Sequence, residues 1–450
     1  MTYLNEDSVN SLLRELYPIT RSVTGNGVRR TLERLSEITP LDVQSVPSGT
    51  QVYDWEVPPE WNIEDAYIEN SDGERIVDIA ENNLHVVSYS VPVETTLTFD
   101  ELKDHLHTLP SMPDAIPYRT TYYDRDWGFC MRHDTLESMD EDDTYEVFID
   151  STLDPEGELT YADARIEGES DEEYILSTYC CHPSLANDNL SGVVLATLLF
   201  EQLRQRDTYH SYRLIIVPET IGSISYLSTH EAPMKNVNGG YVITTVAGPG
   251  TFDYKASFEH DHPVDQAARW ALSDDEYDEY EFVPTGSDER QYSSPGFRIP
   301  TGTIAKDKYY EYKEYHTSKD DLSFISAEAL LETLQRYLWA IGLLEMNRVY
   351  ERVDPHCEFK LDRHDLYPTT GGKQQQPGYL DETDHKEFEY QLADEGAKSG
   401  DVFDAINWLM FSCDGSTSLF RIAKRSGVSV RTLHRAASEL VDAELLEASA

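Results

Sequence analysis

The sequence is poor in basic residues and in hydrophobic residues. Its 450 residues include 36 lysines and arginines against 84 aspartates and glutamates, a formal net charge of -48, and only 39% are hydrophobic. The acidic residues are spread along the chain, with clusters at 140–143, 171–173 and 274–276. In concentrated salt, screening removes the self-repulsion that such a charge creates. We therefore predict a halophilic protein, and an ordinary acidic protein with disordered acidic loops is the alternative.

Cysteines and long apolar segments are also scarce. Five cysteines are too few for a disulfide framework, although Cys180 and Cys181 are adjacent beside a predicted buried strand. No apolar run approaches the length of a membrane span. The first apolar residues are spaced on one helical face between charges, which is unlike a secretory signal. We expect a soluble, reduced protein of the cytoplasm with no membrane partner.

The length predicts two or three domains. Residues 1–45 have the three-to-four apolar spacing of two helices. Residues 49–127 are rich in proline, tyrosine and tryptophan with short alternating segments, which indicates a mostly β insertion. From about 130 to 350, short apolar runs alternate with helical patterns, as in an α/β domain with a largely parallel sheet. We therefore predict a discontinuous α/β domain from 1–48 and 128–355.

The C-terminal part differs in pattern and in charge. A linker without periodicity over 361–384 precedes predicted helices near 385–396, 400–412, 417–426 and 430–441. The spacing within 419–434 is typical of a helix-turn-helix, so we predict a winged helix-turn-helix domain at 380–450.

Residues 416–435 contain five basic residues and no acidic one. Such a contrast suits a DNA-facing surface, but high salt weakens phosphate contacts. We expect this segment to pack within the chain or to contact a homo-oligomer partner, with nucleic-acid binding as the alternative.

The segment 178–192 has the strongest chemical pattern. His182 and Asp188 are six residues apart in the turn that leaves a predicted buried strand, so they can converge on one metal ion. The Asn-Asp-Asn sequence suits a tight turn, and Gly192 lets the next helix pack closely. Polar segments at 217–223, 286–292 and 315–321 also fall where predicted strands end, which is where ligands gather in α/β sheets.

Together these segments resemble the zinc aminopeptidase superfamily, which includes the transferrin receptor ectodomain and glutaminyl cyclases. The shared elements are a histidine, an Asn-Asp-Asn-x-Ser-Gly turn, an acid before Gly-Ser, a Ser-Asp loop and a late Tyr-His-Thr. More closely, the chain is similar to aminopeptidase-like proteins that have an inserted domain and a C-terminal winged helix and are often labelled polysaccharide-biosynthesis associated. The resemblance implies a three-layer α/β sandwich.

The resemblance also implies which residues act. The metal ligands and the general base would be His182, Asp188, His316 and Glu219. The two-zinc members of the superfamily have two more acidic ligands. Here Thr220 stands in place of one of them, and the other is missing near 241–250, with Asp253 a few residues late. We therefore expect one zinc ion per chain, with Asp320 supporting the His316 loop.

Three protein ligands leave one position open for water, as in catalytic zinc sites. We predict a zinc-dependent aminopeptidase-like hydrolase that cleaves an amide bond in a small peptide or another amide-containing substrate. The resemblance places Asp288, Arg290 and Tyr292 on the substrate side. One alternative is an amidase or deacetylase acting on an aminosugar or a cell-surface polysaccharide precursor. The second is a non-catalytic zinc-binding protein or a DNA-binding regulator.

The insertion contains aromatic residues that could line a sugar-binding groove. We favour an ordinary β-domain core for them. They are Trp55, Trp61, Tyr118, Tyr122, Tyr123, Trp127 and Phe129.

Overall fold

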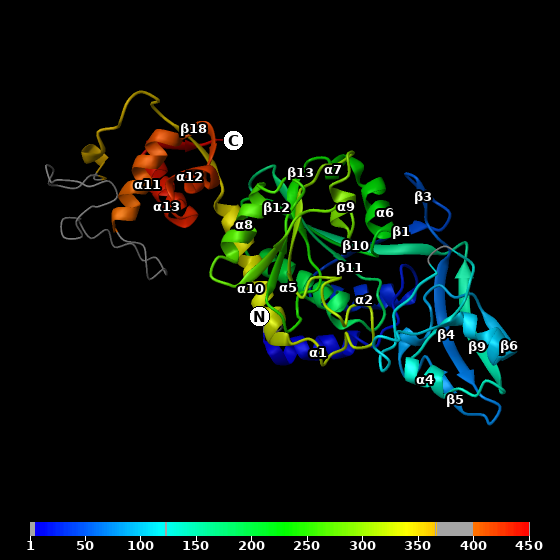
Figure 1. The fold of residues 1–450 in the computed structure, drawn as a ribbon. Helices are drawn as coiled ribbons and strands as arrows, with labels where there is room; N and C mark the ends of the chain where they lie inside the picture. The colour runs from blue at the N-terminus through cyan, green and yellow to red at the C-terminus, as the bar shows by residue number, and fades with distance from the viewer. Residues whose placement is uncertain (1–4, 122–123, 365, 367–398, 450) are drawn as a thin grey trace. The chain divides into compact units, whose positions relative to one another are not determined.

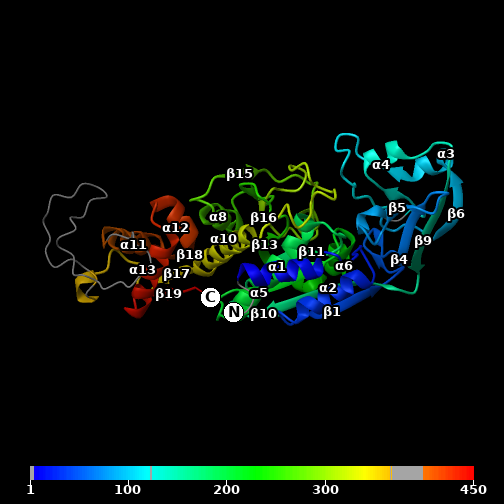
Figure 2. The same ribbon diagram turned by 90° about the horizontal axis from the view of Figure 1, so that it is seen from below.

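The computed structural model describes residues 5–121, 124–364, 366 and 399–449 (Figures 1 and 2). The chain divides into two compact units, Met1–Leu338 and Trp339–Ala450. No described helix is both long enough and apolar enough to cross a membrane.

Both predicted N-terminal helices are present. Helix α1 (Glu6–Leu16) is capped by Asn5, whose side chain accepts a hydrogen bond from Ser8 N, and α2 (Asn26–Ser36) follows. Each helix buries the apolar stripe that its spacing predicts, because residues three and four apart share one helical face. The buried apolar residues are Val9, Leu12, Leu13 and Leu16 in α1 and Val28, Leu32 and Leu35 in α2.

The largest sheet of the described residues has eight strands and forms the centre of the first unit. The strands in spatial order are β1 (Asp42–Pro47), β10 (Glu158–Ile166), β12 (Ser211–Val217), β11 (Glu173–Tyr179), β13 (Val237–Val242), β16 (Thr301–Lys306), β14 (Phe252–Lys255) and β15 (Tyr277–Tyr280). From β12 to β16, neighbouring strands run parallel. β11 and β12 are buried at every residue, as expected for strands that are covered on both faces.

Helices cover the sheet (Figures 1 and 2). They are α5 (Gly192–Arg204), α6 (Ile221–Thr229), α8 (Pro263–Ala271) and α10 (Ala327–Met346). Ile175, Ile215 and Val217 pack with residues of α6 in one core cluster. Because side chains alternate along a strand, Leu176 and Leu214 face the opposite side. The predicted layered α/β fold is confirmed.

The remaining short elements of this unit connect the larger ones. They are β2 (Gln51–Val52), β3 (Trp55–Glu56), α3 (Phe99–Leu102), β7 (Leu106–His107), β8 (Phe129–Cys130), α4 (His133–Ser138), α7 (Glu231–Met234) and α9 (Glu289–Tyr292).

A second, antiparallel sheet corresponds to the predicted β insertion. Its spatial order is β5 (Arg75–Asp78), β4 (Glu60–Glu69), β9 (Thr144–Asp154) and β6 (Val93–Thr98). Strand β9 lies beyond residue 127, so the predicted boundary falls inside this β-rich part. An apolar run predicts a strand but not its partner, which explains the difference. Trp61 and Phe129 are buried in the core of this part, as expected, whereas Tyr122 and Tyr123 lie outside the described residues.

The described part of the second unit contains the end of α10, three further α-helices and a three-stranded sheet. The helices are α11 (Ser399–Ser412), α12 (Leu419–Ser426) and α13 (Val430–Asp442). The strands in spatial order are β18 (Asp414–Ser418), β17 (Val349–Arg352) and β19 (Leu446–Ala448). The predicted helix at 385–396 lies outside the described residues. The winged-helix assignment stays a prediction.

Candidate metal centre

Two adjacent parallel strands bring the first site residues together. Tyr179 ends β11 and pairs in register with Val217, which ends β12. His182 and Glu219 follow these strand ends by three and two residues, so both leave the same edge of the sheet. Their neighbourhood was therefore predictable from the order of strands and motifs.

The turn that carries Asp188 is held by a residue far along the chain. Asp320 accepts hydrogen bonds from the backbone N–H groups of Asn187 (2.6 Å) and Asp188 (3.0 Å). Burial raises the pKa of Asp320 to about 7. Asp320 thus joins its own loop, which also carries His316, to the Asp188 turn. At the end of this turn, a Cβ on Gly192 would lie 2.2 Å from Asn189 Oδ1, so the close approach requires glycine.

Arg21 holds the loop of His182 through hydrogen bonds to its backbone, a role that the sequence pattern did not indicate. Its guanidinium donates to the carbonyl oxygens of His182 (2.9 Å), Pro183 (3.1 Å) and Leu16 (2.8 Å). Arg21 is 3% exposed. The three bonds tie α1 to the turn that follows β11.

We expect Arg21→Met to lower the free energy of unfolding by about 2–4 kcal/mol, because it leaves buried carbonyl oxygens without donors. Urea unfolding measures this as a lower midpoint at an unchanged slope. Arg30→Met, at an exposed position of α2, is the matched control and should change stability by no more than about 0.5 kcal/mol. Equal midpoints for the two variants would contradict the role of Arg21.

His182, Asp188 and His316 form a group that fits a metal ion. One donor atom from each lies within 4.8 Å of the others. His316 Nε2 is 3.0 Å from Asp188 Oδ2, yet both atoms are buried and neither has a hydrogen-bond partner among the described groups. The two atoms are therefore close to each other and have no other partner among the described groups, as expected for ligands of a common ion. Two imidazoles and a carboxylate are also the donor types of catalytic zinc sites.

The electrostatics favour the metal-binding forms of these groups. Burial lowers the pKa of His182 to about 4, so its imidazole is neutral at pH 7. Burial alone would raise the pKa of Asp188, but His182, His316 and the Tyr179 hydroxyl outweigh it and hold the pKa below its usual value. Tyr179 donates to Asp188 Oδ1, which leaves Oδ2 free for the ion. Metal ligands must be deprotonated, and these two are.

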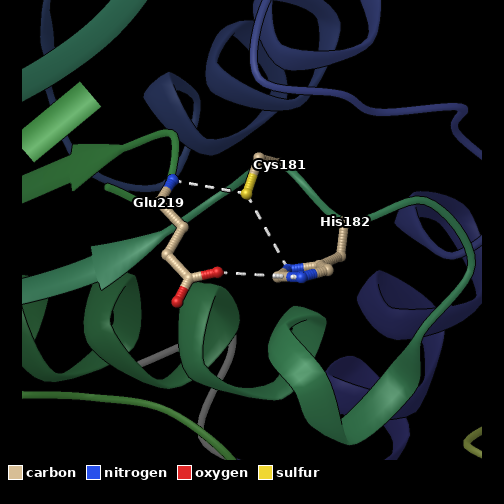
Figure 3. Close-up of side chains that lie close together, drawn as sticks. All are labelled: Cys181, His182 and Glu219. Atoms are coloured by element: carbon tan, nitrogen blue, oxygen red, sulfur yellow. Dashed lines mark hydrogen bonds and ion pairs between the residues drawn. The ribbon is translucent and has the colours of Figure 1, made fainter. Parts of the chain in front are cut away.

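Glu219 lies beside His182 of this group (Figure 3). Its Oε2 is 3.9 Å from His182 Nε2, and 23% of its side chain is exposed. Burial, followed by the charges of Asp288 and Asp188, raises the pKa of Glu219 well above the usual value. A raised pKa makes the Glu219 carboxylate a stronger proton acceptor than an ordinary glutamate, which suits a general base.

The backbone after Glu219 adopts an unusual conformation. Thr220 has φ of 63°, a region that β-branched residues rarely adopt and that costs on the order of 1–3 kcal/mol. Asp288 Oδ1 accepts hydrogen bonds from Thr220 N and Ser223 Oγ, both at 2.8 Å. Arg290 Nη2 donates to Thr220 Oγ1 (3.0 Å). These contacts hold the turn that aims Glu219.

Two of the three residues predicted on the substrate side are buried in the structure, and their substrate role stays a prediction. Asp288 and Tyr292 are both 0% exposed. Asp288 supports the Glu219 turn, and the Tyr292 hydroxyl bonds to Ser177 Oγ (2.7 Å) inside the core. The position of this loop followed from the resemblance, but which of its side chains point inward depends on packing against β11. Arg290 remains partly exposed.

Thr220 and Asp253 stand at or near the positions where further acidic ligands were expected, and the number of bound ions stays a prediction. Thr220 replaces one acid. Asp253 is 7% exposed, accepts a hydrogen bond from Lys308 N (2.7 Å), and belongs to none of the metal-ligand groups of the described residues.

Aromatic rings surround the candidate ligands. The Tyr118 ring, from the insertion, lies edge-on to His182 (5.2 Å between centroids) and to His316 (5.1 Å). Tyr315 stacks on His316 (3.9 Å), and Tyr310 lies edge-on to Tyr315 (5.1 Å). Tyr310 is 62% exposed. Tyr315 belongs to the late Tyr-His-Thr segment of the resemblance, whereas no sequence pattern indicated a role for Tyr310.

Comparisons with known proteins agree with this architecture. The family model described as "Domain of unknown function (DUF4910)" matches residues 10–347. A Clostridium acetobutylicum protein, named as a candidate polysaccharide biosynthesis protein with an aminopeptidase-like domain, is 43% identical over 441 residues, 98% of this chain and 96% of that protein.

Solved structures show the same relationship. A crystal structure of a candidate peptidase from Clostridium acetobutylicum has a TM-score of 0.85 and 41% identity, covering 98% of this chain and 96% of that one. BSAP, a zinc aminopeptidase from Bacillus subtilis, has a TM-score of 0.54 at 13% identity, covering 75% and 94%. At that identity only the fold is comparable. This chain belongs to the DUF4910 family, and its larger unit has the zinc aminopeptidase fold.

Proposed function

We propose that this protein is a zinc-dependent hydrolase of the aminopeptidase type, which cleaves an amide bond. The observation that carries the proposal is the convergence of His182, Asp188 and His316, with two buried donor atoms that lack other partners, beside the partly exposed carboxyl group of Glu219. A zinc ion held by these three residues would supply Lewis-acid activation of water and of the substrate carbonyl group.

The residues around the ligands have distinct parts in this proposal. Glu219 accepts the proton of the attacking water and passes it to the leaving nitrogen. Asp288 and Arg290 hold the Thr220 turn and so keep Glu219 in place. Tyr179 orients the Asp188 carboxylate through its hydroxyl group.

A second candidate substrate is an amide on an aminosugar, and the rings of Tyr118, Tyr310 and Tyr315 favour it. They lie next to the candidate ligands, and aromatic rings stack on the apolar faces of sugars. The relative named for polysaccharide biosynthesis supports the same candidate.

The zinc-loaded protein should therefore hydrolyse either aminoacyl chromogenic amides or N-acetylated aminosugars. A parallel screen of both classes, with product formation as the readout, separates the two candidates. Activity must disappear on chelation and in His316→Ala. A zinc-loaded protein that is inert toward both classes would contradict the hydrolase proposal and favour a non-catalytic zinc-binding protein.

A further inference from the structure

A second group of metal-type donors shares His182 with the candidate zinc site. Cys181, His182 and Glu219 lie together where β11 and β12 end (Figure 3). Cys181 Sγ is 3.8 Å from His182 Nδ1, and Glu219 Oε2 is 3.9 Å from His182 Nε2. In the proposed hydrolysis, His182 and Glu219 take part in the chemistry and the Cys181 thiol does not.

One ion binds only one imidazole nitrogen. The relevant separations are therefore those from a single nitrogen of His182 to the Cys181 sulfur and to a Glu219 oxygen, and these lie within 4.8 Å. In a tetrahedral site, bonds of about 2.3 Å to sulfur and about 2.0 Å to nitrogen or oxygen place neighbouring donors roughly 3.3–3.6 Å apart. Glu219 has the most exposed side chain of the three, at 23%, so it can make the adjustment that an ion requires.

The sulfur is already oriented toward this group. Cys181 Sγ accepts a hydrogen bond from Glu219 N (3.3 Å), which turns the thiol toward the strand ends. Cys181 and His182 are 4% and 5% exposed, and Arg21 holds the carbonyl oxygen of His182. Two of the three donors are therefore fixed before an ion arrives.

We propose that Cys181, His182 and Glu219 form an inhibitory site for a thiophilic divalent cation, such as Cd²⁺ or zinc in excess. A soft sulfur donor selects such ions over Mg²⁺ and Ca²⁺. On binding, the thiol proton leaves to solvent and the thiolate, the imidazole and the carboxylate coordinate the ion. Glu219 then cannot accept a proton. The inhibitory role rests on the proposed function, whereas binding itself does not.

Cadmium titration of the metal-free full-length protein tests the site through the ultraviolet thiolate-to-cadmium charge-transfer band. The wild-type protein should show the band of one thiolate per chain. Cys181→Ser should lose it, and Cys357→Ser, at an exposed cysteine, should keep it. A band that survives in Cys181→Ser, or its absence from the wild-type protein, would overturn the proposal.

Two further variants keep the test independent of catalysis and of any folding defect in Cys181→Ser. His316→Ala should retain the band, because His316 is not part of this group. Glu219→Gln keeps the sulfur ligand but should bind Cd²⁺ more weakly. The loss of affinity should exceed the roughly 10- to 100-fold loss that follows when a residue that only hydrogen-bonds to a metal ligand is replaced. Unchanged affinity in Glu219→Gln, or loss of the band in His316→Ala, would contradict the ligand set. Once a substrate is known, Cd²⁺ should inhibit the wild-type protein and not Cys181→Ser.

Discussion

Replacing His316 with alanine should abolish stoichiometric zinc binding while the protein keeps its fold. His316 supplies one of three ligands from a loop, and 31% of its side chain is exposed, so its loss removes little packing. The wild-type protein should hold one zinc ion per chain by elemental analysis, and His316→Ala should hold none after the same purification.

Thermal unfolding gives an independent readout of the same change. An ion at 100 times its dissociation constant stabilises the folded state by about 2.7 kcal/mol, so chelation should lower the melting temperature of the wild-type protein and leave that of His316→Ala unchanged. His356→Ala is the matched control, because His356 is exposed and bonds only to Asp354 within the described contacts. Two tightly bound zinc ions, none in the wild-type protein, or full occupancy in His316→Ala would each contradict the assignment.

Glu219→Gln should lower turnover by about 10²- to 10⁴-fold, the usual contribution of a general base, with zinc still bound.

The same substitution should stabilise the metal-free protein near neutral pH. Glutamine has a similar shape and no charge. The substitution therefore removes the cost of placing a partly buried carboxylate close to the charges of Asp288 and Asp188. Where the pH is high enough to ionise Glu219 in the wild-type protein, the expected gain is about 1–3 kcal/mol.

The sign of the pH dependence follows from the raised pKa of Glu219. Glu219 binds its proton more tightly in the folded protein than in the unfolded chain. Protonation of Glu219 therefore stabilises the folded state, and this stabilisation is complete at low pH. It is lost as the pH rises past the ordinary value of 4.5 and through the raised value in the folded protein. As the pH rises above 4.5, the free energy of unfolding of the metal-free wild-type protein should thus fall more steeply than that of Glu219→Gln. Asp288, with its pKa raised to about 6 by burial, adds the same trend in both proteins.

Urea unfolding with chelator present, at a single ionic strength, measures this difference. Glu156→Gln is the control, since Glu156 is exposed in the turn between β9 and β10. A Glu219→Gln protein with full turnover would exclude the general-base role. If the free energy of unfolding had the same pH dependence in Glu219→Gln and Glu156→Gln, the pKa of Glu219 would not be raised by its surroundings.

Local patterns were sufficient for much of the fold and for the neighbourhood of the site. Apolar spacing identifies α1 and α2, because a helical face repeats every three to four residues. Short apolar runs alternating with helical patterns identify the central parallel sheet. Parallel neighbouring strands end at one edge, so the sequence also brings His182 and Glu219 together.

Other features depend on contacts between segments that are distant in the sequence. Strand β9 has an alternating pattern that does not reveal whether its partner is β4 or a strand of the central sheet. Arg21 reaches the carbonyl oxygen of a residue 161 positions away, and Asp320 binds the backbone of Asn187 at 133 positions. No local period encodes such pairs, because a hydrogen bond is defined by position in space.

By itself, the sequence determined which residue types were present at the strand ends and therefore the class of chemistry that the site can support. Only the tertiary structure decided how each side chain is used. Packing made Asp288 a support of the Glu219 turn and Tyr292 a core residue, placed Tyr118 against both histidines, and raised the pKa of Glu219. Exposure and pKa depend on every neighbouring segment at once, so they follow from the packed structure and not from the order of residues.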